Sequence, residues 1–254
     1  LEDAAVGTIT EVGSEFGSMS QALADHCASR GGQLTCIDPA PAPKFAQWAA
    51  AHPHVNHIAL PSLEVLADGP AADAWMIDGD HNYYTVFHEL SFIDAAARAA
   101  GRPLLVFLHD VSWPCARRDF YYAPDRIPAE WRHPHSFEHG TRLGSPEALL
   151  RRGLRGMGQF AIAMEEGGAR NGVLTAVEDF LSLADTPERR LCYAHVPAVL
   201  GLGVVFAADA PWSDAVVGRL AVYHQNPLIA RLEESRLLNY LEVIDWQDRS
   251  AAAE

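Results

Sequence analysis

The sequence has few cysteines, few positive charges and no long apolar run. Its four cysteines are scattered without C-x-x-C spacing, which favours reduced thiols over a disulfide framework or a zinc site. Lysine and arginine number 19 against 33 aspartates and glutamates, a net charge of −14, which argues against binding nucleic acid or an anionic membrane through bulk charge. No stretch reaches the roughly 18 apolar residues of a membrane span, and no signal peptide is visible. We therefore expect a cytoplasmic protein without nucleic-acid or membrane partners.

The 254 residues, 49% of them hydrophobic, suffice for one large α/β domain, and we expect residues 1–254 to form one. The chain begins with Leu1 rather than Met, which leaves open whether an N-terminal segment precedes it. Short apolar strands alternate with amphipathic helices, a pattern typical of a doubly wound, mostly parallel sheet. The seven expected strands are 7–13, 33–38, 57–60, 75–78, 104–108, 191–195 and 200–206. The last two are expected to form an antiparallel hairpin at the sheet edge.

Helices are expected between these strands and at the end of the chain. They cover 14–27, 44–52, a short stretch from Ser62, 83–100 and 171–183. In the first, Met19, Leu23 and Cys27 recur at i, i+4 and i+8 and are expected to share its buried face. Residues 207–254 form a C-terminal helical tail, which is broken or restarts at Asn226-Pro227.

Two of the expected strands are apolar throughout and then stop at charged residues. They are W-M-I-D-G-D-H, from Trp75 to His81, and L-L-V-F-L-H-D, from Leu104 to Asp110. Ligands of open α/β sheets bind beyond the carboxyl ends of the strands. If these strands are neighbours, three carboxylates and two imidazoles converge there: Asp78, Asp80, His81, His109 and Asp110. That set suits a divalent metal or acid/base chemistry better than packing.

The first strand, turn, helix and second strand together have the pattern of a nucleoside-binding unit. Gly13 and Gly17 are spaced G-x-x-x-G in the turn, and Asp38 closes the second strand. Glycines let the backbone approach a ligand, and the acid can accept hydrogen bonds from ribose hydroxyls. The spacing is not G-x-G-x-x-G, so a dinucleotide is less favoured. The alternative is a helix cap and a solvated aspartate.

Residues 111–165 interrupt the alternation and are rich in aromatic residues, arginine and histidine. Long irregular segments in compact domains are usually functional or disordered, and the aromatic content argues against disorder. We expect an inserted lid after the fifth strand that contacts substrate. Its candidate residues, with salt bridges and core packing as the alternative, are Trp113, Arg117, Arg118, Tyr121 and Tyr122. The spacing of His133, His135 and His139 fits one helix face poorly, which favours an exposed lid over a metal site.

Four motifs resemble class I S-adenosylmethionine-dependent methyltransferases. They are E-V-G-S-E-F-G-S from Glu11, I-D-P from Ile37, M-I-D-G-D-H from Met76 and F-L-H-D-V from Phe107. The branch that they resemble most contains the metal-dependent O-methyltransferases of bacterial natural-product pathways. Those enzymes methylate sugars on macrolides and aminocoumarins, so the resemblance also implies a role in antibiotic biosynthesis. The resemblance implies a Rossmann-like methyltransferase fold with S-adenosyl-L-methionine as cofactor.

The resemblance also implies roles for individual residues. Glu11, Gly13 and Gly17, with the adjacent Ser14 and Ser18, line the methionine and ribose end of the cofactor. Asp38 binds the ribose hydroxyls, Ser62 lies near the adenine, and Asp78 adjoins the cofactor. The metal ligands are Asp78, His109 and Asp110. His109 stands where a carboxylate is usual, so Mn or Fe competes with Mg for this site.

The expected reaction is methyl transfer to a hydroxyl group of a sugar or polyketide-like small molecule. The metal binds and orients the oxygen, and His81, or else Asp80, takes the proton. Two rival hypotheses remain open. The first is a cephalosporin hydroxylase-like oxygenase or a cyclase with the same scaffold. The second is a chain that is catalytically silent and serves as a structural partner. A homo-oligomer is compatible with each of them.

Overall fold

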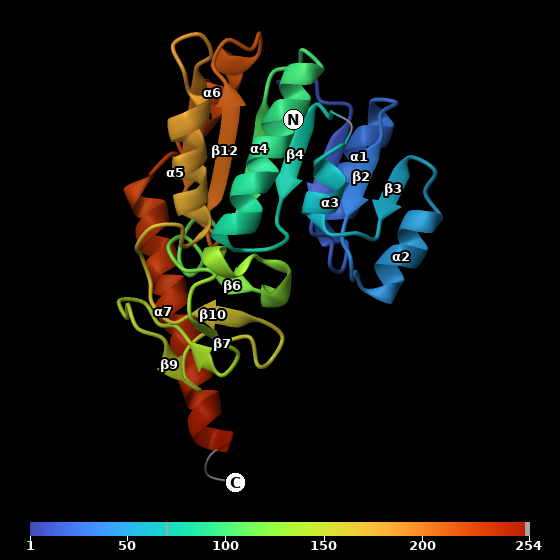
Figure 1. Cartoon of the computed structure of the whole chain (residues 1–254). Coiled ribbons are helices and arrows are strands. Elements are labelled where there is room, and N and C mark those ends of the chain that lie inside the picture. Colours follow the sequence, from blue (N-terminus) through green and yellow to red (C-terminus); the bar gives the residue numbers. More distant parts are fainter. Residues whose placement is uncertain (70, 252–254) are drawn as a thin grey trace.

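A seven-stranded sheet organises the computed structural model, which describes residues 1–69 and 71–251. Its strand order is β11-β12-β5-β4-β1-β2-β3 (Figure 1). The strands are β1 (Ile9–Val12), β2 (Leu34–Ile37), β3 (Val55–Ile58), β4 (Ala74–Ile77), β5 (Leu105–His109), β11 (Leu191–Val196) and β12 (Leu202–Ala207). β1 to β5 run parallel, whereas β12 is antiparallel to both β5 and β11. The predicted sheet and its terminal antiparallel hairpin are confirmed.

Helices cover both faces of the sheet, as a doubly wound fold requires. One face packs against α3 (Ser62–Leu66), α4 (Tyr83–Ala99) and α5 (Val173–Ala184). The other packs against α1 (Ser18–Ser29), α2 (Pro43–Ala50) and α6 (Ser213–Leu220). In α4 the 3.6-residue period places Val86, Leu90, Ile93 and Ala97 on the sheet side, where each is at most 1% exposed. The result is a three-layer sandwich with a core on each side of the sheet.

The first helix begins later than its sequence predicts, and this corrects one predicted core residue. Gly17 precedes α1 in a left-handed conformation with φ 78°, so Ser14 to Gly17 form a turn. Leu23 and Cys27 are buried as expected, but Met19 is 62% exposed. Met19 lies in the first turn of α1, at the carboxyl edge of the sheet, where the helix has not yet reached the sheet face.

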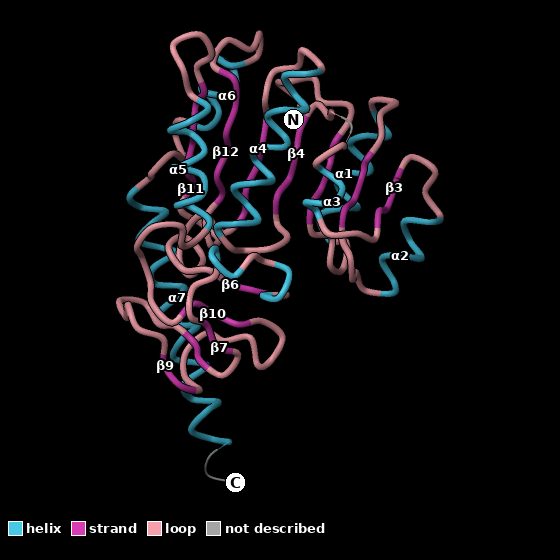
Figure 2. The backbone as a smooth tube through the Cα atoms, in the orientation of Figure 1, coloured by secondary structure: helices cyan, strands magenta, loops and turns pink. Residues whose placement is uncertain are grey.

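The segment 111–165 lies beyond the carboxyl ends of the parallel strands and is mostly loop (Figures 1 and 2). Its regular elements are two short 3-10 helices and the strands β6 (Phe120–Tyr121), β7 (His135–Ser136), β8 (His139–Gly140), β9 (Leu149–Leu150) and β10 (Ala161–Ala163). β6 and β7 flank β10 in a small separate sheet. The Phe120 amide donates to the His81 carbonyl at 2.9 Å, which fixes the insertion to the loop after β4.

The C-terminal tail consists of α6 and α7 (Pro227–Ala251), with the break at Asn226-Pro227 as predicted. Asn226 caps α7, since its side-chain oxygen accepts hydrogen bonds from the amides of Leu228 and Ile229 at 3.0 and 3.2 Å. α7 runs beside the insertion toward the C-terminus (Figure 1). Within the described residues, no helix is long and apolar enough to cross a membrane.

Candidate functional site

Three neighbouring strands end in one row. The register pairs Val12 with Ile77 and Ile77 with Leu108, so Gly13, Asp78 and His109 stand next to each other one residue further along. The Asp78 amide donates to the Val12 carbonyl at 2.9 Å, which continues the ladder to this edge. The predicted glycine turn and the predicted ionisable residues therefore share the carboxyl edge of the sheet.

Four ionisable side chains meet at this edge: Asp78, His81, His109 and Asp110. The His109 Nδ1 atom lies 3.3 Å from Asp78 Oδ1 and 3.1 Å from Asp110 Oδ2. The His81 Nε2 atom lies 3.4 Å from Asp78 Oδ1 and 3.1 Å from Asp110 Oδ2. Each imidazole thus contacts both carboxylates. We refer to these four residues as the edge cluster.

A strained backbone conformation brings His109 and Asp110 to the same side of the sheet. Consecutive residues of a strand point to opposite faces, but Asp110 adopts φ 61° directly after β5 ends. This left-handed conformation is uncommon for a residue with a side chain and often marks a functional site. It turns the Asp110 carboxylate back toward His109, and the Asp110 side chain is only 6% exposed.

The contacts in the edge cluster shift the pKa of three of its members. Burial alone raises the pKa of Asp78, but its contacts with His109 and His81 lower it to about 2. Burial alone lowers the pKa of His81, but the charges of Asp110 and Asp78 raise it to about 9. Hydrogen bonds with Asp110 and Asp78 raise the pKa of His109 to about 10. In the chain by itself these contacts therefore favour the ionised form of Asp78 and the protonated forms of His81 and His109.

This donor set suits a divalent cation. One ligand atom each from Asp78, His109 and Asp110 lie within 4.8 Å of one another. Carboxylates are typical ligands of Mg²⁺ and Mn²⁺, and imidazole is a typical ligand of Fe(II) and Zn²⁺. A cation would replace the positive charge that the imidazoles now supply, and its binding would release the proton from His109 Nδ1.

The glycine turn is held against the ends of β2 and β4. The Asp38 Oδ2 atom accepts hydrogen bonds from the amides of Ser14 and Glu15 at 2.9 and 2.8 Å. Gly13 has φ 85°, and a Cβ there would collide with the Asp78 carbonyl oxygen. Only glycine allows this approach. The turn, the end of β2 and the end of β4 thus form one rigid unit beside the edge cluster.

Glu11 supports the turn from below. It is 2% exposed, and its Oε2 atom accepts hydrogen bonds from Ser20 Oγ at 2.5 Å, Ser14 Oγ at 3.2 Å and Cys36 Sγ at 3.2 Å. Burial raises its pKa despite these contacts. Ser18 is exposed at the start of α1, and Ser62 is half-buried at the start of α3. The structure thus spreads the predicted cofactor residues along one edge of the sheet, from β4 through β1 and β2 to β3.

Asp80 faces away from the edge cluster. Its Oδ2 atom accepts a hydrogen bond from Thr85 Oγ1 of α4 at 3.0 Å, and its Oδ1 atom is buried without a partner in the described structure. Of the two predicted catalytic residues, the structure therefore places His81 with the metal-ligand candidates and Asp80 at the start of α4.

The predicted substrate residues divide between the edge and the interior of the insertion. Tyr122 is 50% exposed, and its ring meets the His81 ring edge-on at 6.0 Å. Tyr121 is fully buried and donates to Asp119 Oδ2 at 2.8 Å. Arg117 forms two hydrogen bonds with Glu178 of α5, at 2.6 and 2.7 Å. Tyr121 and Arg117 thus match the packing and salt-bridge alternative.

Arg118 is also an interior residue, because it is 0% exposed. Its guanidinium donates to the carbonyls of Ala163 at 2.5 Å and Pro146 at 2.7 Å, which ties together distant parts of the insertion. Trp113 is half-buried, and its Nε1 atom is buried without a hydrogen-bond partner in the described structure. The position of Arg118 corrects the prediction that it contacts substrate, because its guanidinium donates to carbonyls inside the protein and not toward the edge cluster.

Two features of this edge are missed by sequence reasoning. Cys115 is 3% exposed, and its sulfur lies within 4.8 Å of ligand atoms of His81 and Asp110. Burial raises the pKa of this thiol, so it stays protonated and is a poor metal ligand by itself. Phe16 and Met19, which follow Gly13, are 69% and 62% exposed. In the sequence, only the short spacing between Cys115 and Asp110 could have suggested that Cys115 lies at this edge.

The three histidines of the insertion do not gather. His133 Nε2 contacts the Arg170 carbonyl at 2.9 Å, His135 Nδ1 contacts the His133 carbonyl at 2.9 Å, and His139 Nδ1 contacts Ser136 Oγ at 2.8 Å. None of the three belongs to a group of potential metal ligands among the described residues. Their roles are local hydrogen bonds within the insertion.

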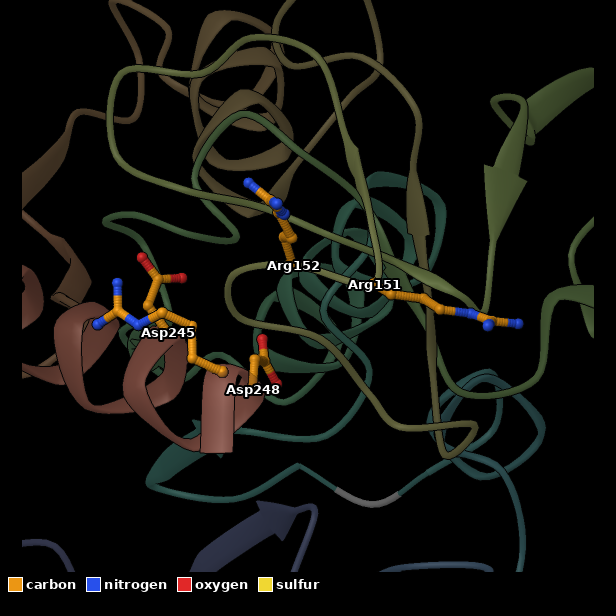
Figure 3. Close-up of a pocket in the computed structure, with 5 residues that line it drawn as sticks. Arg151, Arg152, Asp245 and Asp248 are labelled. Atoms are coloured by element: carbon orange, nitrogen blue, oxygen red, sulfur yellow. The ribbon is translucent and has the colours of Figure 1, made fainter. Parts of the chain in front are cut away.

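A cleft of about 440 Å³ lies between the insertion and α7, lined by Arg151, Arg152, Asp245, Asp248 and Arg249 (Figure 3). Asp248 is already paired with Arg155, at 2.5 Å, and Asp245 with Arg142, at 2.6 Å. Figure 3 shows Arg151 extending away from both aspartates. The cleft contains no residue of the edge cluster, and its arginines do not converge on one point.

Part of this chain is similar to known proteins. Residues 10–111, which hold the glycine turn and the whole edge cluster, match the model of a methyltransferase domain. No curated protein matches the sequence.

Solved structures with a similar fold include three methyltransferases. One is the 1,6-didemethyltoxoflavin-N1-methyltransferase of Burkholderia thailandensis, bound to S-adenosylhomocysteine (17% identity, 79% of this chain and 69% of that one, TM-score 0.42). Another is a Podospora anserina methyltransferase (13% identity, 80% and 72%, TM-score 0.43). The third is an O-methyltransferase from neocarzinostatin biosynthesis (14% identity, 80% and 49%, TM-score 0.43), of which this chain spans about half the length.

Proposed function

We propose that this chain transfers a methyl group from S-adenosyl-L-methionine to a hydroxyl oxygen of a small natural product, with a divalent cation at Asp78, His109 and Asp110. The row formed by Gly13, Asp78 and His109 carries the proposal, because it sets a nucleoside-type turn beside a metal-type donor set. The match of residues 10–111 to a methyltransferase domain supports the same reading.

In this proposal the cofactor lies along the edge formed by β4, β1 and β2. The backbone of the turn at Gly13 and Gly17 approaches it closely, and Asp38 faces its ribose. Asp38 accepts the amides of Ser14, Glu15 and Ala40, which leaves about one of the four acceptor sites of a carboxylate for a ribose hydroxyl. The cofactor supplies an activated methyl group, so the protein has to align one oxygen with it and exclude competing water.

The edge cluster would hold the acceptor oxygen and remove its proton. Asp78, His109 and Asp110 would bind the cation, which lowers the pKa of a bound hydroxyl. His81 would take the proton at Nε2. Its pKa of about 9 reflects Asp110 and Asp78, and a cation beside those carboxylates would lower that pKa toward the range of a working base.

The surroundings of the edge cluster favour a small, partly apolar acceptor. The exposed side chains of Phe16 and Met19 follow the glycine turn, and Tyr122 contacts His81 from the insertion. Rings and apolar groups of this kind can flank a sugar or polyketide-like molecule. We propose that the insertion serves as the lid of this site, with Tyr122 as its contact to the acceptor.

A second candidate function rests on the donor set itself. Two imidazoles and one carboxylate with open positions are the ligands of non-haem iron oxygenases, and His81 and His109, which both contact Asp110 at 3.1 Å, would supply such a set here. The same edge would then support hydroxylation. A mass spectrum of the product separates the two, since methylation adds about 14 Da and hydroxylation about 16 Da. Incubation with candidate hydroxylated acceptors, S-adenosyl-L-methionine and Mg²⁺ or Mn²⁺ should yield the first shift and S-adenosylhomocysteine. A shift of about 16 Da with Fe(II) would overturn the proposal.

A further inference from the structure

α7 has two opposite apolar faces, and only one of them is covered. Leu237 and Leu241 are 4% and 2% exposed, and Glu233 on the same side accepts the Leu200 amide at 2.9 Å. This inner face attaches α7 to the loop between β11 and β12. The described part of the chain leaves the outer face open.

The outer face is a stripe of large apolar side chains. Leu228, Leu232, Val243 and Trp246 are 67%, 62%, 51% and 62% exposed. With 3.6 residues per turn they fall within a sector of about 60°, on the side of α7 opposite Leu237. An outward apolar stripe that extends over most of a 25-residue helix is unusual for a helix that faces only water. We call these four residues the outer stripe.

The outer stripe is self-complementary about the middle of α7. Leu228 and Trp246 lie equally far from Leu237 in the sequence, and Leu232 and Val243 nearly so. Between them the exposed positions are small or polar, at Ser235 and Asn239. An antiparallel copy of the same helix, centred on this point, would place each apolar pair opposite its counterpart and the smaller side chains at the crossing.

One pair of charges beside the outer stripe follows the same symmetry. Arg231 and Glu242 are both exposed and lie on the same flank of α7. An antiparallel copy would bring Arg231 opposite the partner's Glu242, and the twofold axis would repeat that pair. In the single chain, Arg231 lies 3.7 Å from Glu234, and both side chains are more than half exposed. Arg231 is therefore free to change its partner.

From this pattern we infer that α7 joins two copies of this chain in an antiparallel, twofold-symmetric dimer through Leu228, Leu232, Val243 and Trp246. Isologous pairing of one patch with itself is the commonest way in which soluble chains form dimers. The complementarity of Arg231 with the partner's Glu242 favours a second copy of this chain as the occupant. The inference does not depend on the proposed methyl transfer.

Sedimentation velocity of the full chain, over about 1 to 100 µM, tests this dimer. The unchanged chain should sediment as a dimer, and Leu232→Glu with Trp246→Glu should make it a monomer at every concentration. Arg231→Glu should weaken the dimer at least about tenfold, because it sets like charges opposite each other. The double exchange Arg231→Glu with Glu242→Arg should restore the dimer, which no general loss of folding could do.

The matched control is Leu183→Glu, at a residue of α5 that is 70% exposed and lies outside α7. It should leave the dimer intact, and circular dichroism should show every variant folded. A monomer at 100 µM for the unchanged chain would overturn the inference. So would a dimer that survives Leu232→Glu with Trp246→Glu, or a double exchange that fails to restore it.

Discussion

The His81 Nε2 atom lies 3.1 Å from the Asp110 Oδ2 atom. This contact joins the loop after β4 to the turn after β5, two segments that are nearly 30 residues apart in the chain. The left-handed conformation of Asp110 makes it possible, because it aims the carboxylate across the sheet edge and not along the strand. A charged group bound beside His81 and Asp110 can therefore interact with the residues that follow both β4 and β5.

The first prediction concerns the two carboxylates. Asp78→Asn and Asp110→Asn keep the shape of each side chain but remove the anionic oxygen that a cation prefers. Each should weaken Mn²⁺ binding at least about tenfold in calorimetry and lower turnover at least about 100-fold. The affinity of Asp110→Asn for S-adenosylhomocysteine should change by no more than about threefold, because Asp110 is not among the predicted cofactor residues.

The control for these variants is Asp125→Asn, at a fully exposed aspartate of the insertion, which should match the unchanged chain in both assays. Unaltered Mn²⁺ affinity in Asp78→Asn and Asp110→Asn would show that these residues hold no cation. Unaltered turnover would show that neither carboxylate takes part in catalysis.

Gly13→Ala should be strongly destabilising. Its new Cβ would meet the Asp78 carbonyl oxygen and the Gly79 backbone at φ 85°, so both a collision and a strained conformation oppose it. The free energy of unfolding in urea should fall by about 2 kcal/mol or more, with loss of S-adenosylhomocysteine binding.

Gly101→Ala separates the two effects, since Gly101 has φ 62° but an added Cβ there would have no other atom within 4 Å. The strain alone should cost about 1 kcal/mol. If Gly13→Ala and Gly101→Ala lowered the free energy of unfolding equally, the close approach of Gly13 to the end of β4 would contribute nothing to stability.

The Glu89 side chain should make the stability of the fold depend on pH. It is 0% exposed, and burial raises its pKa from 4.5 to about 8. Below about pH 4.5 the side chain is protonated in the folded and unfolded states. As the pH rises from there to about 8, the unfolded chain loses the proton while the folded chain keeps it, so stability falls.

Glu89→Gln removes this titration with little change of shape. Between pH 5 and pH 8 the stability of the variant should therefore rise relative to the unchanged chain, by up to about 4 kcal/mol. Urea titrations at several pH values measure the difference, with the exposed Glu64→Gln as control. Parallel curves for Glu89→Gln and the unchanged chain would mean that Glu89 ionises in the fold without penalty.

Asp119 should be essential for attaching the insertion. It is 0% exposed and accepts the amides of Tyr83 and Gly172, each at 2.7 Å, and the Tyr121 hydroxyl at 2.8 Å. These bonds join the starts of α4 and α5 to β6. Asp119→Ala should lower the free energy of unfolding by about 3 kcal/mol, because three buried donors lose their acceptor. A loss under about 0.5 kcal/mol, the size expected for a surface change, would contradict this role.

The sheet could be predicted because its signals are local. Apolar strands, glycine turns and helical periods recur in order, and strand ends such as Ile77-Asp78 show where the apolar run stops. Parallel strands then bring those ends to one edge. His81, His109, Asp78 and Asp110 meet there as expected, although sequence spacing cannot show that Asp80 turns toward Thr85.

The insertion could not be predicted in the same way, because its contacts are not periodic. Arg118 resembles a substrate-binding arginine in the sequence, yet it is buried against the carbonyls of Ala163 and Pro146. Cys115 reaches the edge cluster only because the chain folds back after Asp110. Met19 fits a helical period, but the helix begins too late to bury it. Each outcome depends on partners far away in the chain.

The central claim is that a cation and a nucleoside lie side by side at this edge. A crystal structure of the chain grown with S-adenosylhomocysteine and Mn²⁺, with anomalous data collected near the manganese edge, tests it most directly. The account predicts one anomalous peak bound by Asp78, His109 and Asp110, with the nucleoside along the turn at Gly13 and its ribose at Asp38. A map with the nucleoside elsewhere, or with no peak among those three side chains, would contradict it.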